Sequence, residues 1–204
     1  MNKLHTTKRI LIIGGMGPQA SIHAHKRLQE MLIRKGKNAE IVHISLVVEH
    51  FFSSKPALNL TDAQIALLKS IEADTGFIAC NTAHLFFDHI SKLVNFKLIS
   101  MLDSDEDQNS IMVCSPTSRK FKVFGNYVQY MDDQLDMDAG DIIELVNTGQ
   151  ESAATKKFTS LISSLPPGRS PLVSCTELSM LAHRLELNLK CTLEKCLRKI
   201  VKDI

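Results

Sequence analysis

The sequence predicts an α/β fold of two similar lobes, each a mainly parallel sheet flanked by helices. Short β-branched apolar runs alternate with segments of helical period, which is typical of parallel sheets. A strongly polar window interrupts this alternation near the middle of the chain, and two predicted strands end in matching cysteine motifs. The composition excludes a disordered chain, because 44% of the 204 residues are apolar and 23% are charged.

The first half of the chain contains four predicted strands and three predicted helices. The first strand is a β-branched apolar run that stops at Gly14, and Pro18 suits the first turn of the helix that follows. Gly36 is a plausible end for that helix, and Thr61 is a suitable N-cap for the next one. In chain order, we expect strands at 8–13, 40–44, 76–80 and 97–101, and helices at 19–35, 61–72 and 82–94.

The second half repeats the alternation after the polar window at residues 103–110 (DSDEDQNS). We expect strands at 111–114, 127–131 and 171–175, helices at 139–146 and 153–165, and two more helices that begin at Glu177 and Thr192. We therefore predict an N-terminal lobe at 1–102 and a C-terminal lobe at 103–189, with the last helix, at about 190–204, packing back on the first lobe.

Composition also argues against several classes of protein. No apolar run approaches the ~20 residues of a membrane helix, and no small-residue cleavage site follows the early apolar run, so we expect neither a membrane span nor a secretory signal. The net charge of +2 provides no basic field for nucleic acid and no polybasic patch for anionic lipid, so we expect neither as a partner. Five cysteines without CxxC spacing favour reduced thiols in a cytoplasmic protein over disulfides or a zinc site.

A glycine-rich turn, GGMGPQAS, follows the first strand and precedes the first helix. It does not fit the dinucleotide-binding fingerprint, because Pro18 and Ala20 replace the expected glycine spacing and no acidic residue ends the second strand. Two interpretations remain open. The segment is either a tight β–α turn only, or a set of backbone N–H groups that binds a small anion such as a carboxylate.

Cys80 and Cys175 both lie at the carboxyl end of a predicted strand and at the start of a predicted helix. Ligands of open parallel sheets bind at this edge, and a helix start stabilises a thiolate and lowers its pKa. A single buried cysteine is usually a small apolar packing residue, but two in matching positions favour a chemical role. Cys114 also closes a strand, whereas Cys191 and Cys196 are expected to pack on the terminal helix.

Three motifs resemble the signature motifs of the aspartate/glutamate racemase family. They are Gly14-Gly15-Met16-Gly17-Pro18, Ala79-Cys80-Asn81-Thr82-Ala83-His84 and Ser174-Cys175-Thr176-Glu177-Leu178, in the family's order and at roughly its spacing. The resemblance spans nearly the whole chain. It implies a two-lobed α/β protein with the active site in the cleft between the lobes, which racemises an amino acid or related small carboxylate without pyridoxal phosphate or metal. Relatives are often dimers, so it also implies a homodimer.

The resemblance assigns roles to individual residues. One of the two thiols, Cys80 or Cys175, would remove the Cα proton as a thiolate while the other donates a proton to the opposite face. His84 and Glu177 would tune the thiols, although a hydrogen-bonded wall residue and a helix N-terminal carboxylate are equally good descriptions of them. The implied substrate-binding residues are Met16, Gly17, Pro18, Asn81, Thr82, Ala83, Thr117 and Thr176.

The chain departs from the family pattern where an acidic substrate would be bound. The family carries an Arg after the second strand, but the segment at 44–52 (ISLVVEHFF) has none, and its two phenylalanines would suit a more apolar pocket. The family's Lys before a Gly in the second lobe is also missing from LVNTG at 145–149. Arg119 or Lys120 is a candidate replacement, or simply part of a solvated basic turn.

Three functions follow from the sequence. The first is a cofactor-independent amino acid racemase that uses Cys80 and Cys175. The second is a racemase or isomerase of another small carboxylate or a hydantoin, with the same thiols. The third is a weakened relative that only binds a small metabolite, its cysteines kept for packing. Neither the substrate side chain nor the assignment of a thiol to each enantiomer follows from the sequence.

Overall fold

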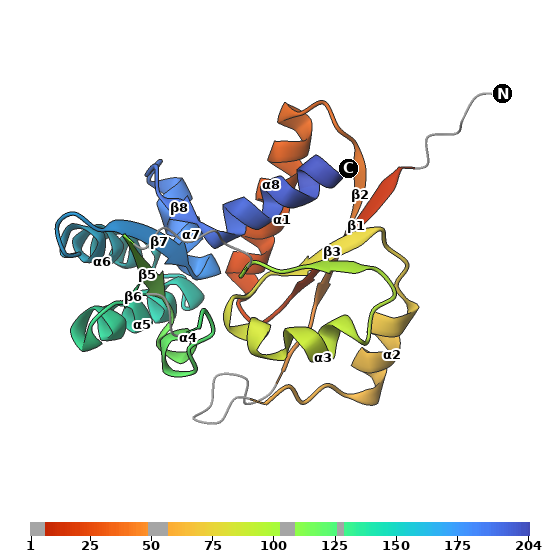
Figure 1. The fold of residues 1–204 in the computed structure, drawn as a ribbon, viewed down its shortest axis with the longest axis horizontal. Coiled ribbons are helices and arrows are strands. Elements are labelled where there is room, and N and C mark those ends of the chain that lie inside the picture. Colours follow the sequence, from red (N-terminus) through yellow and green to blue (C-terminus); the bar gives the residue numbers. More distant parts are fainter. Residues whose placement is uncertain (1–6, 49–56, 103–108, 126–128) are drawn as a thin grey trace.

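The computed structural model describes residues 7–48, 57–102, 109–125 and 129–204. Two four-stranded sheets form its two lobes, and every strand pair within them is parallel. The strand orders are β2-β1-β3-β4 in the first sheet and β6-β5-β7-β8 in the second, so the two lobes repeat one topology. Figure 1 shows the lobes side by side, each sheet with helices around it. The predicted fold class is confirmed.

The first lobe follows the predicted alternation, with β1 and β2 slightly longer than expected and β3 and β4 shorter. Its strands are β1 (Lys8–Gly14), β2 (Ala39–Ser45), β3 (Thr75–Ile78) and β4 (Lys97–Ile99). Its helices are α1 (Pro18–Arg34), α2 (Asp62–Ser70), the 3₁₀ helix η1 (Thr82–Phe86) and α3 (Phe87–Ser91). The single helix expected at 82–94 is therefore wrong. Phe86 leaves the helical region (φ −115°, ψ 16°) between η1 and α3, where Phe86 and Phe87 pack against the apolar core.

The second lobe contains the predicted elements, with α5 beginning six residues earlier than expected, and two short ones that the sequence analysis did not include. Its strands are β5 (Ser110–Cys114), β6 (Gln129–Tyr130), β7 (Ser170–Ser174) and β8 (Lys190–Cys191). Its helices are α4 (Pro116–Lys120), α5 (Asp133–Asn147), α6 (Glu151–Ser163) and α7 (Thr176–Arg184), and α8 (Thr192–Asp203) ends the chain. The additions are α4 and β8. Most of the polar window, residues 103–108, lies outside the described residues. The first two residues of the strand expected at 127–131 lie outside the described residues as well.

Alternating side chains of β1 build the two cores of the first lobe. Ile10 and Ile12 face the layer of α1 and α8, whereas Leu11 and Ile13 face the layer of α2 and α3. This follows from the two-residue period of a strand, and it explains why β1 is apolar throughout. The second lobe packs α5, α6 and α7 on its own sheet in a separate cluster that includes Phe158.

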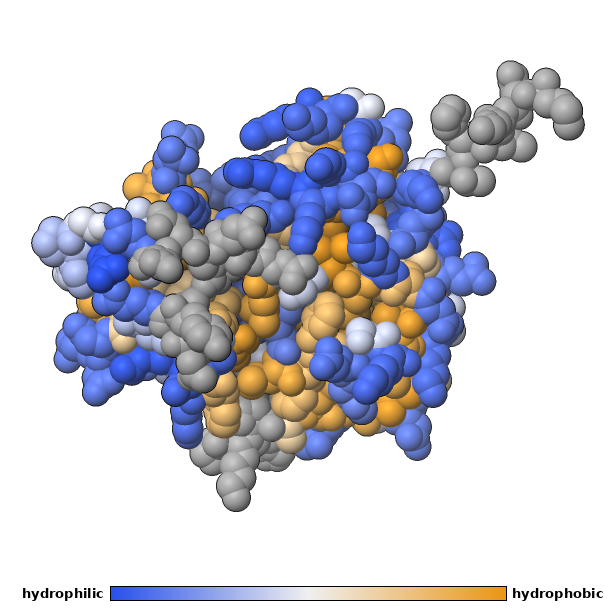
Figure 2. Space-filling model, viewed as in Figure 1, coloured by the Kyte–Doolittle hydropathy of each residue, from blue (hydrophilic) through white to orange (hydrophobic). Residues whose placement is uncertain are grey.

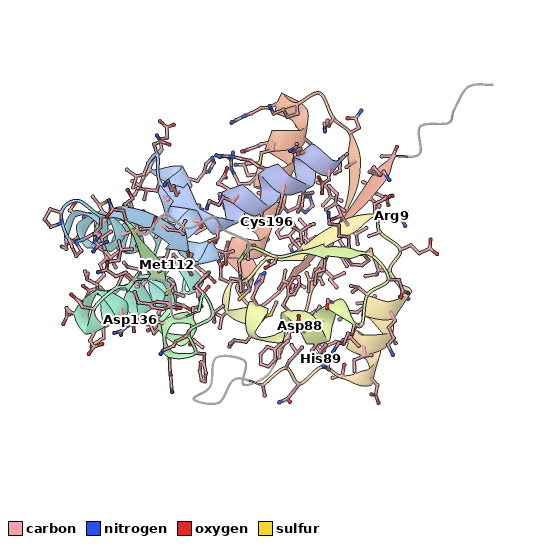
Figure 3. The ribbon with its side chains drawn as sticks, in the orientation of Figure 1. Arg9, Asp88, His89, Met112, Asp136 and Cys196 are labelled. Atoms are coloured by element: carbon pink, nitrogen blue, oxygen red, sulfur yellow. The ribbon has the colours of Figure 1, made fainter. Side chains whose placement is uncertain are left out.

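Helix α8 belongs to the core of the first lobe although it follows the last strand of the second. Its apolar face contributes Leu193, Cys196, Leu197, Ile200 and Val201 to the cluster around β1 and α1. Cys196, labelled in Figure 3, belongs to this layer, and α8 crosses α1 in Figure 1. The chain thus connects its lobes twice, once between β4 and β5 and once between β8 and α8. Among the described helices, none has the length and apolar character needed to span a bilayer.

Candidate active site

The two cysteines follow topologically equivalent strands. Cys80 comes two residues after the end of β3, and Cys175 directly follows β7, which is the third strand in the order of the second sheet just as β3 is in the first. Each cysteine also precedes a helix, η1 in one lobe and α7 in the other. The carboxyl edges of the two sheets therefore present one thiol each, where open parallel sheets bind their ligands.

Both thiols line one small cavity between the lobes. The first lobe contributes three consecutive residues to its wall, and the second lobe contributes the rest: Cys80, Asn81, Thr82, Ser115, Ile143, Ser174, Cys175, Thr176 and Glu177. The cavity has a volume of only about 20 Å³, which is enough for roughly one water molecule. The structure therefore shows a closed state, and an organic ligand requires the lobes or the wall side chains to move apart.

Equivalent backbone N–H groups donate hydrogen bonds to the two sulfur atoms. The N–H groups of Thr82 and Ala83 hydrogen-bond to the Cys80 sulfur, and those of Glu177 and Leu178 hydrogen-bond to the Cys175 sulfur. In both motifs the donors lie two and three positions after the cysteine, at the start of the following helix. These bonds favour the thiolate, as expected for a helix start.

Burial outweighs those donors, and the expectation of a lowered thiol pKa is wrong for this closed state. Desolvation, followed by the nearby charge of Glu177, raises the pKa of Cys80 to about 12. The same two causes raise the pKa of Cys175 well above its ordinary value. Cys80 is 7% exposed and Cys175 is 5% exposed, so a thiolate at either position would be a nearly dry anion.

Glu177 connects the two thiols electrostatically. Its carboxylate is buried and accepts a hydrogen bond from the Cys175 thiol, with 3.0 Å between Sγ and Oε2. The Thr176 hydroxyl donates to the same oxygen at 3.1 Å. Because the charge of Glu177 also acts on Cys80, one carboxylate opposes ionisation of both sulfur atoms.

The glycine turn lies close to Oε1, the other oxygen of this carboxylate. Gly17 precedes α1, and a Cβ built on it would lie 2.1 Å from Glu177 Oε1, so only glycine leaves room for the carboxylate there. Gly15, with φ +101°, adopts the left-handed conformation that brings the turn over the backbone of Leu46. The turn thus lies against Glu177, and Met16, Gly17 and Pro18 do not line the cavity wall.

Replacing Gly17 by alanine should move the Glu177 carboxylate and leave the fold intact. The backbone at Gly17 is extended (φ −167°), so alanine fits the backbone and the flexible end of Glu177 has to shift. Moving the charge away lowers the pKa of Cys175, and we expect its alkylation by iodoacetamide at fixed pH to become roughly two- to tenfold faster. Peptide mass spectrometry measures this rate at each cysteine separately.

The matched control is Gly140→Ala on α5, whose new Cβ would meet only the Pro116 ring, at 3.1 Å. Thermal unfolding of both variants reports whether the fold is kept. An unchanged alkylation rate at Cys175 in Gly17→Ala, or an equal change in Gly140→Ala, would show that the turn does not position the carboxylate.

Asn81 presents a buried donor without a partner. Its Oδ1 accepts a hydrogen bond from the Thr192 hydroxyl at 3.0 Å, which fixes the orientation of the amide. Its Nδ2 is buried and has no hydrogen-bond partner among the described residues. Since buried polar groups are almost always satisfied, an unsatisfied N–H₂ on a cavity wall indicates a place for an acceptor such as a carboxylate oxygen.

Three hydroxyl groups join the lobes beside the cavity. The Thr82 hydroxyl, in the first lobe, lies 3.0 Å from that of Ser115 and 2.9 Å from that of Ser118, both in the second lobe. Ser115 also caps α4, because its side chain accepts a hydrogen bond from the Ser118 N–H. This cluster closes the cleft with bonds that water or a ligand hydroxyl can replace.

His84 supports the site through the backbone. The Met101 N–H donates to Nε2 at 3.0 Å, so Nδ1 carries the proton and donates to the Cys80 carbonyl at 2.9 Å. Both ring nitrogens are thereby used, and the neutral ring ties the Cys80 backbone to the chain just after β4. Of the two candidates for tuning the thiols, Glu177 contacts a sulfur and His84 contacts the peptide group behind one.

The other predicted contacts lie away from the cavity. Ala83 is in the apolar core and offers only its N–H, and Thr117 lies on α4 outside the cavity wall. Arg119 is paired with Asp133 and Asp136 on α5, the latter labelled in Figure 3. Among the described residues, no Lys or Arg lines the cavity. The Phe51-Phe52 pair lies outside the described residues.

Sequence reasoning missed three residues of the cavity wall. Ser115 directly follows β5 and Ser174 ends β7, so the strand-end rule that selected the cysteines would also have found them. Ile143 comes from the middle of α5, and the sequence holds no local signal for its position.

Comparisons with known proteins identify the fold. No protein-family model matches the chain, and the curated proteins contain no match to it. An aspartate racemase homologue from Pyrococcus horikoshii has a similar structure, with a TM-score of 0.62, 19% identity, and coverage of 96% of this chain and 98% of that chain. A candidate Asp/Glu racemase from Yersinia pestis has a TM-score of 0.59, 16% identity and the same coverage of both chains. Over nearly its whole length, the chain therefore has the two-lobed α/β fold of these Asp/Glu racemase structures.

Proposed function

We propose that this protein is a cofactor-independent amino acid racemase or epimerase in which Cys80 and Cys175 are the acid–base pair. The observation that carries the proposal is that one thiol from each lobe lines the same interlobe cavity, each at the equivalent position of a repeated topology. Inversion at Cα requires one base on each face of the carbon, and a cleft between two similar lobes supplies them from opposite sides.

The chemistry conserves protons. The thiolate of one cysteine takes the Cα proton and becomes a thiol, and the electron pair left on carbon is delocalised into the substrate carboxylate. The thiol of the other cysteine then gives its proton to the opposite face and becomes a thiolate. Backbone N–H groups at both helix starts would stabilise the thiolates, and the Asn81 amide would stabilise the negative charge that develops on the substrate.

Glu177 offers a way to form the first thiolate in a dry site. When the Cys175 proton passes to Glu177 Oε2 over the 3.0 Å contact, the pair still carries a single negative charge. No additional ion is buried, which matters because burying an ion costs several kcal/mol. The same step removes the repulsion between Glu177 and a thiolate at Cys80, because the Glu177 carboxyl group is then neutral.

The substrate that fits this wall best has a small uncharged side chain. The cavity wall contains the carboxylate of Glu177 and, among the described residues, no cation, so a side-chain carboxylate would meet repulsion without a partner. Ile143 is the apolar member of the wall and suits a methyl-sized group. The Asn81 amide would receive the α-carboxylate. Alanine and serine are accordingly better candidates than aspartate or glutamate.

Exchange of the Cα proton in deuterated water tests the proposal. Single enantiomers of alanine, serine, aspartate, glutamate and a hydantoin are incubated with the protein, and NMR follows loss of the Cα proton while chiral chromatography follows inversion. We expect both for at least one amino acid. Exchange with the hydantoin alone would indicate a hydantoin racemase instead of an amino acid racemase. No exchange with any compound of the panel would show that the proposal is wrong.

A small-molecule binding protein is the second candidate, favoured by the raised pKa values of both thiols and by the closed cavity. The same panel separates it from an enzyme. A binding protein would show a higher melting temperature with one of these compounds, because a ligand that binds only the folded state stabilises it, while the Cα proton of that compound stays in place.

A further inference from the structure

A second feature with chemical potential lies away from the thiols, in a groove between α1 and α8. The groove has a volume of about 620 Å³ and shares no residue with the thiol cavity. Its walls are the C-terminal half of α1, the turn after it and residues of α8: Arg27, Met31, Arg34, Lys35, Lys37, Glu194, Arg198, Val201 and Lys202. Its size falls within the usual range of pockets for small organic ligands.

The groove concentrates positive charge that the composition conceals. The whole chain carries 24 Lys and Arg against 22 Asp and Glu, yet six cations and one carboxylate line this groove. The rest of the chain therefore has 18 cations against 21 carboxylates. Figure 2 shows a largely hydrophilic surface over α8 and the neighbouring end of α1.

Two of the six cations hold the walls together. Arg27 is buried on α1 and forms two hydrogen bonds to Glu194 on α8, at 2.8 and 3.1 Å, which also neutralises the one carboxylate of the groove. Lys37 reaches across from the turn after α1 and donates to the Val201 carbonyl at 2.7 Å. These contacts fix α1 against α8, so the groove is formed before any ligand arrives.

The other four cations are available to a ligand. Among the described residues, Arg34, Lys35, Arg198 and Lys202 form no hydrogen bond or ion pair through their side chains, and all four are exposed. They come from both walls, two from the end of α1 and two from α8. Four unpaired like charges that line one groove favour a bound counter-ion of several negative charges over four separate ones.

We propose that this groove binds a small organic polyphosphate of the nucleoside diphosphate or triphosphate class. Its three or four negative charges match the four unpaired cations, and guanidinium and ammonium groups are the usual protein partners of phosphate. Met31, which is half-buried, provides apolar surface in the same groove for an uncharged ring system. The excess of carboxylates over the rest of the chain argues against a long nucleic acid, which needs an extended basic surface.

Calorimetric titration of the full chain tests the site. The probes are ATP, tripolyphosphate, AMP and a single-stranded oligonucleotide, each at two salt concentrations. We expect ATP to bind, AMP to bind much more weakly, and the affinity to fall as salt rises, because the contacts are ionic. Tripolyphosphate binding as tightly as ATP would assign the recognition to the phosphate chain, and weaker binding would add the ring to it.

The test variant is Arg34→Gln with Arg198→Gln, one change on each wall. We expect it to weaken ATP binding roughly tenfold, since two exposed ionic contacts are removed. The matched control is Lys69→Gln with Lys156→Gln, two exposed cations on α2 and α6 outside the groove, which should bind like the unmodified chain. No ATP binding up to millimolar concentration, equal loss in the control, or tighter binding of the oligonucleotide than of ATP would overturn the proposal.

Discussion

Cys80→Ala and Cys175→Ala should each reduce racemisation at least roughly 10³-fold, because each removes the only base on one face of Cα. A sharper result is expected from the exchange assay. With one thiol left, a variant can still remove a proton from one enantiomer and return deuterium to the same face, without inversion. Cys80→Ala should therefore exchange the Cα proton of one enantiomer, and Cys175→Ala should exchange that of the other. NMR measures exchange and chiral chromatography measures inversion in the same sample.

Other buried cysteines supply the controls for this pair. Cys114 ends β5 in the second lobe and Cys196 lies in the first lobe on α8, and neither lines the cavity. Cys114→Ala and Cys196→Ala remove the same sulfur atom from an equally buried position, so they should lose stability and keep activity. Near-normal racemisation in both directions by Cys80→Ala or Cys175→Ala would show that the two-thiol mechanism is wrong.

Much of the fold was predictable because the apolar runs and the turn residues of the sequence indicate the same strands and helices. The apolar runs that became β1, β3, β5 and β7 are central strands, whose two buried faces require apolar residues throughout. Turn residues then mark where the helices start and stop. The errors lie in two places. At Phe86, tertiary packing overrides the hydrophobic periodicity of the sequence. At β8, the element is too short to show any hydrophobic periodicity.

The electrostatics of the site could be predicted only in part. The sequence places both thiols at helix starts, and the backbone N–H groups do favour their thiolates. It cannot show that closure of the cleft removes water from both, or that Glu177 lies against Cys175 Sγ, because both depend on how two separate lobes meet. Charge counting could not locate the cations of the α1–α8 groove for a similar reason, since a net charge averages over surfaces that folding separates.

Glu177→Gln should increase the fraction of thiolate at both cysteines and yet decrease the rate of racemisation. The charge of Glu177 raises the pKa of both cysteines, so a neutral amide lowers both values, and more thiolate is present at any given pH. The pH dependence of iodoacetamide alkylation at Cys80 and Cys175 should accordingly shift to lower pH. Racemisation should nevertheless fall roughly 10²-fold or more, because the amide cannot accept the Cys175 proton.

This opposition separates the two roles that Glu177 could have. If its carboxylate only opposed thiolate formation, removing the charge would make the enzyme faster; if it receives the proton, removal makes the enzyme slower in spite of the more acidic thiols. Glu177→Asp keeps the charge and should restore part of the rate, while Glu144→Gln removes an exposed carboxylate from α5 and should change neither readout. A Glu177→Gln variant that racemises faster than the unmodified chain, with both alkylation profiles shifted to lower pH, would assign the carboxylate a purely electrostatic role and leave the first deprotonation to solvent or substrate.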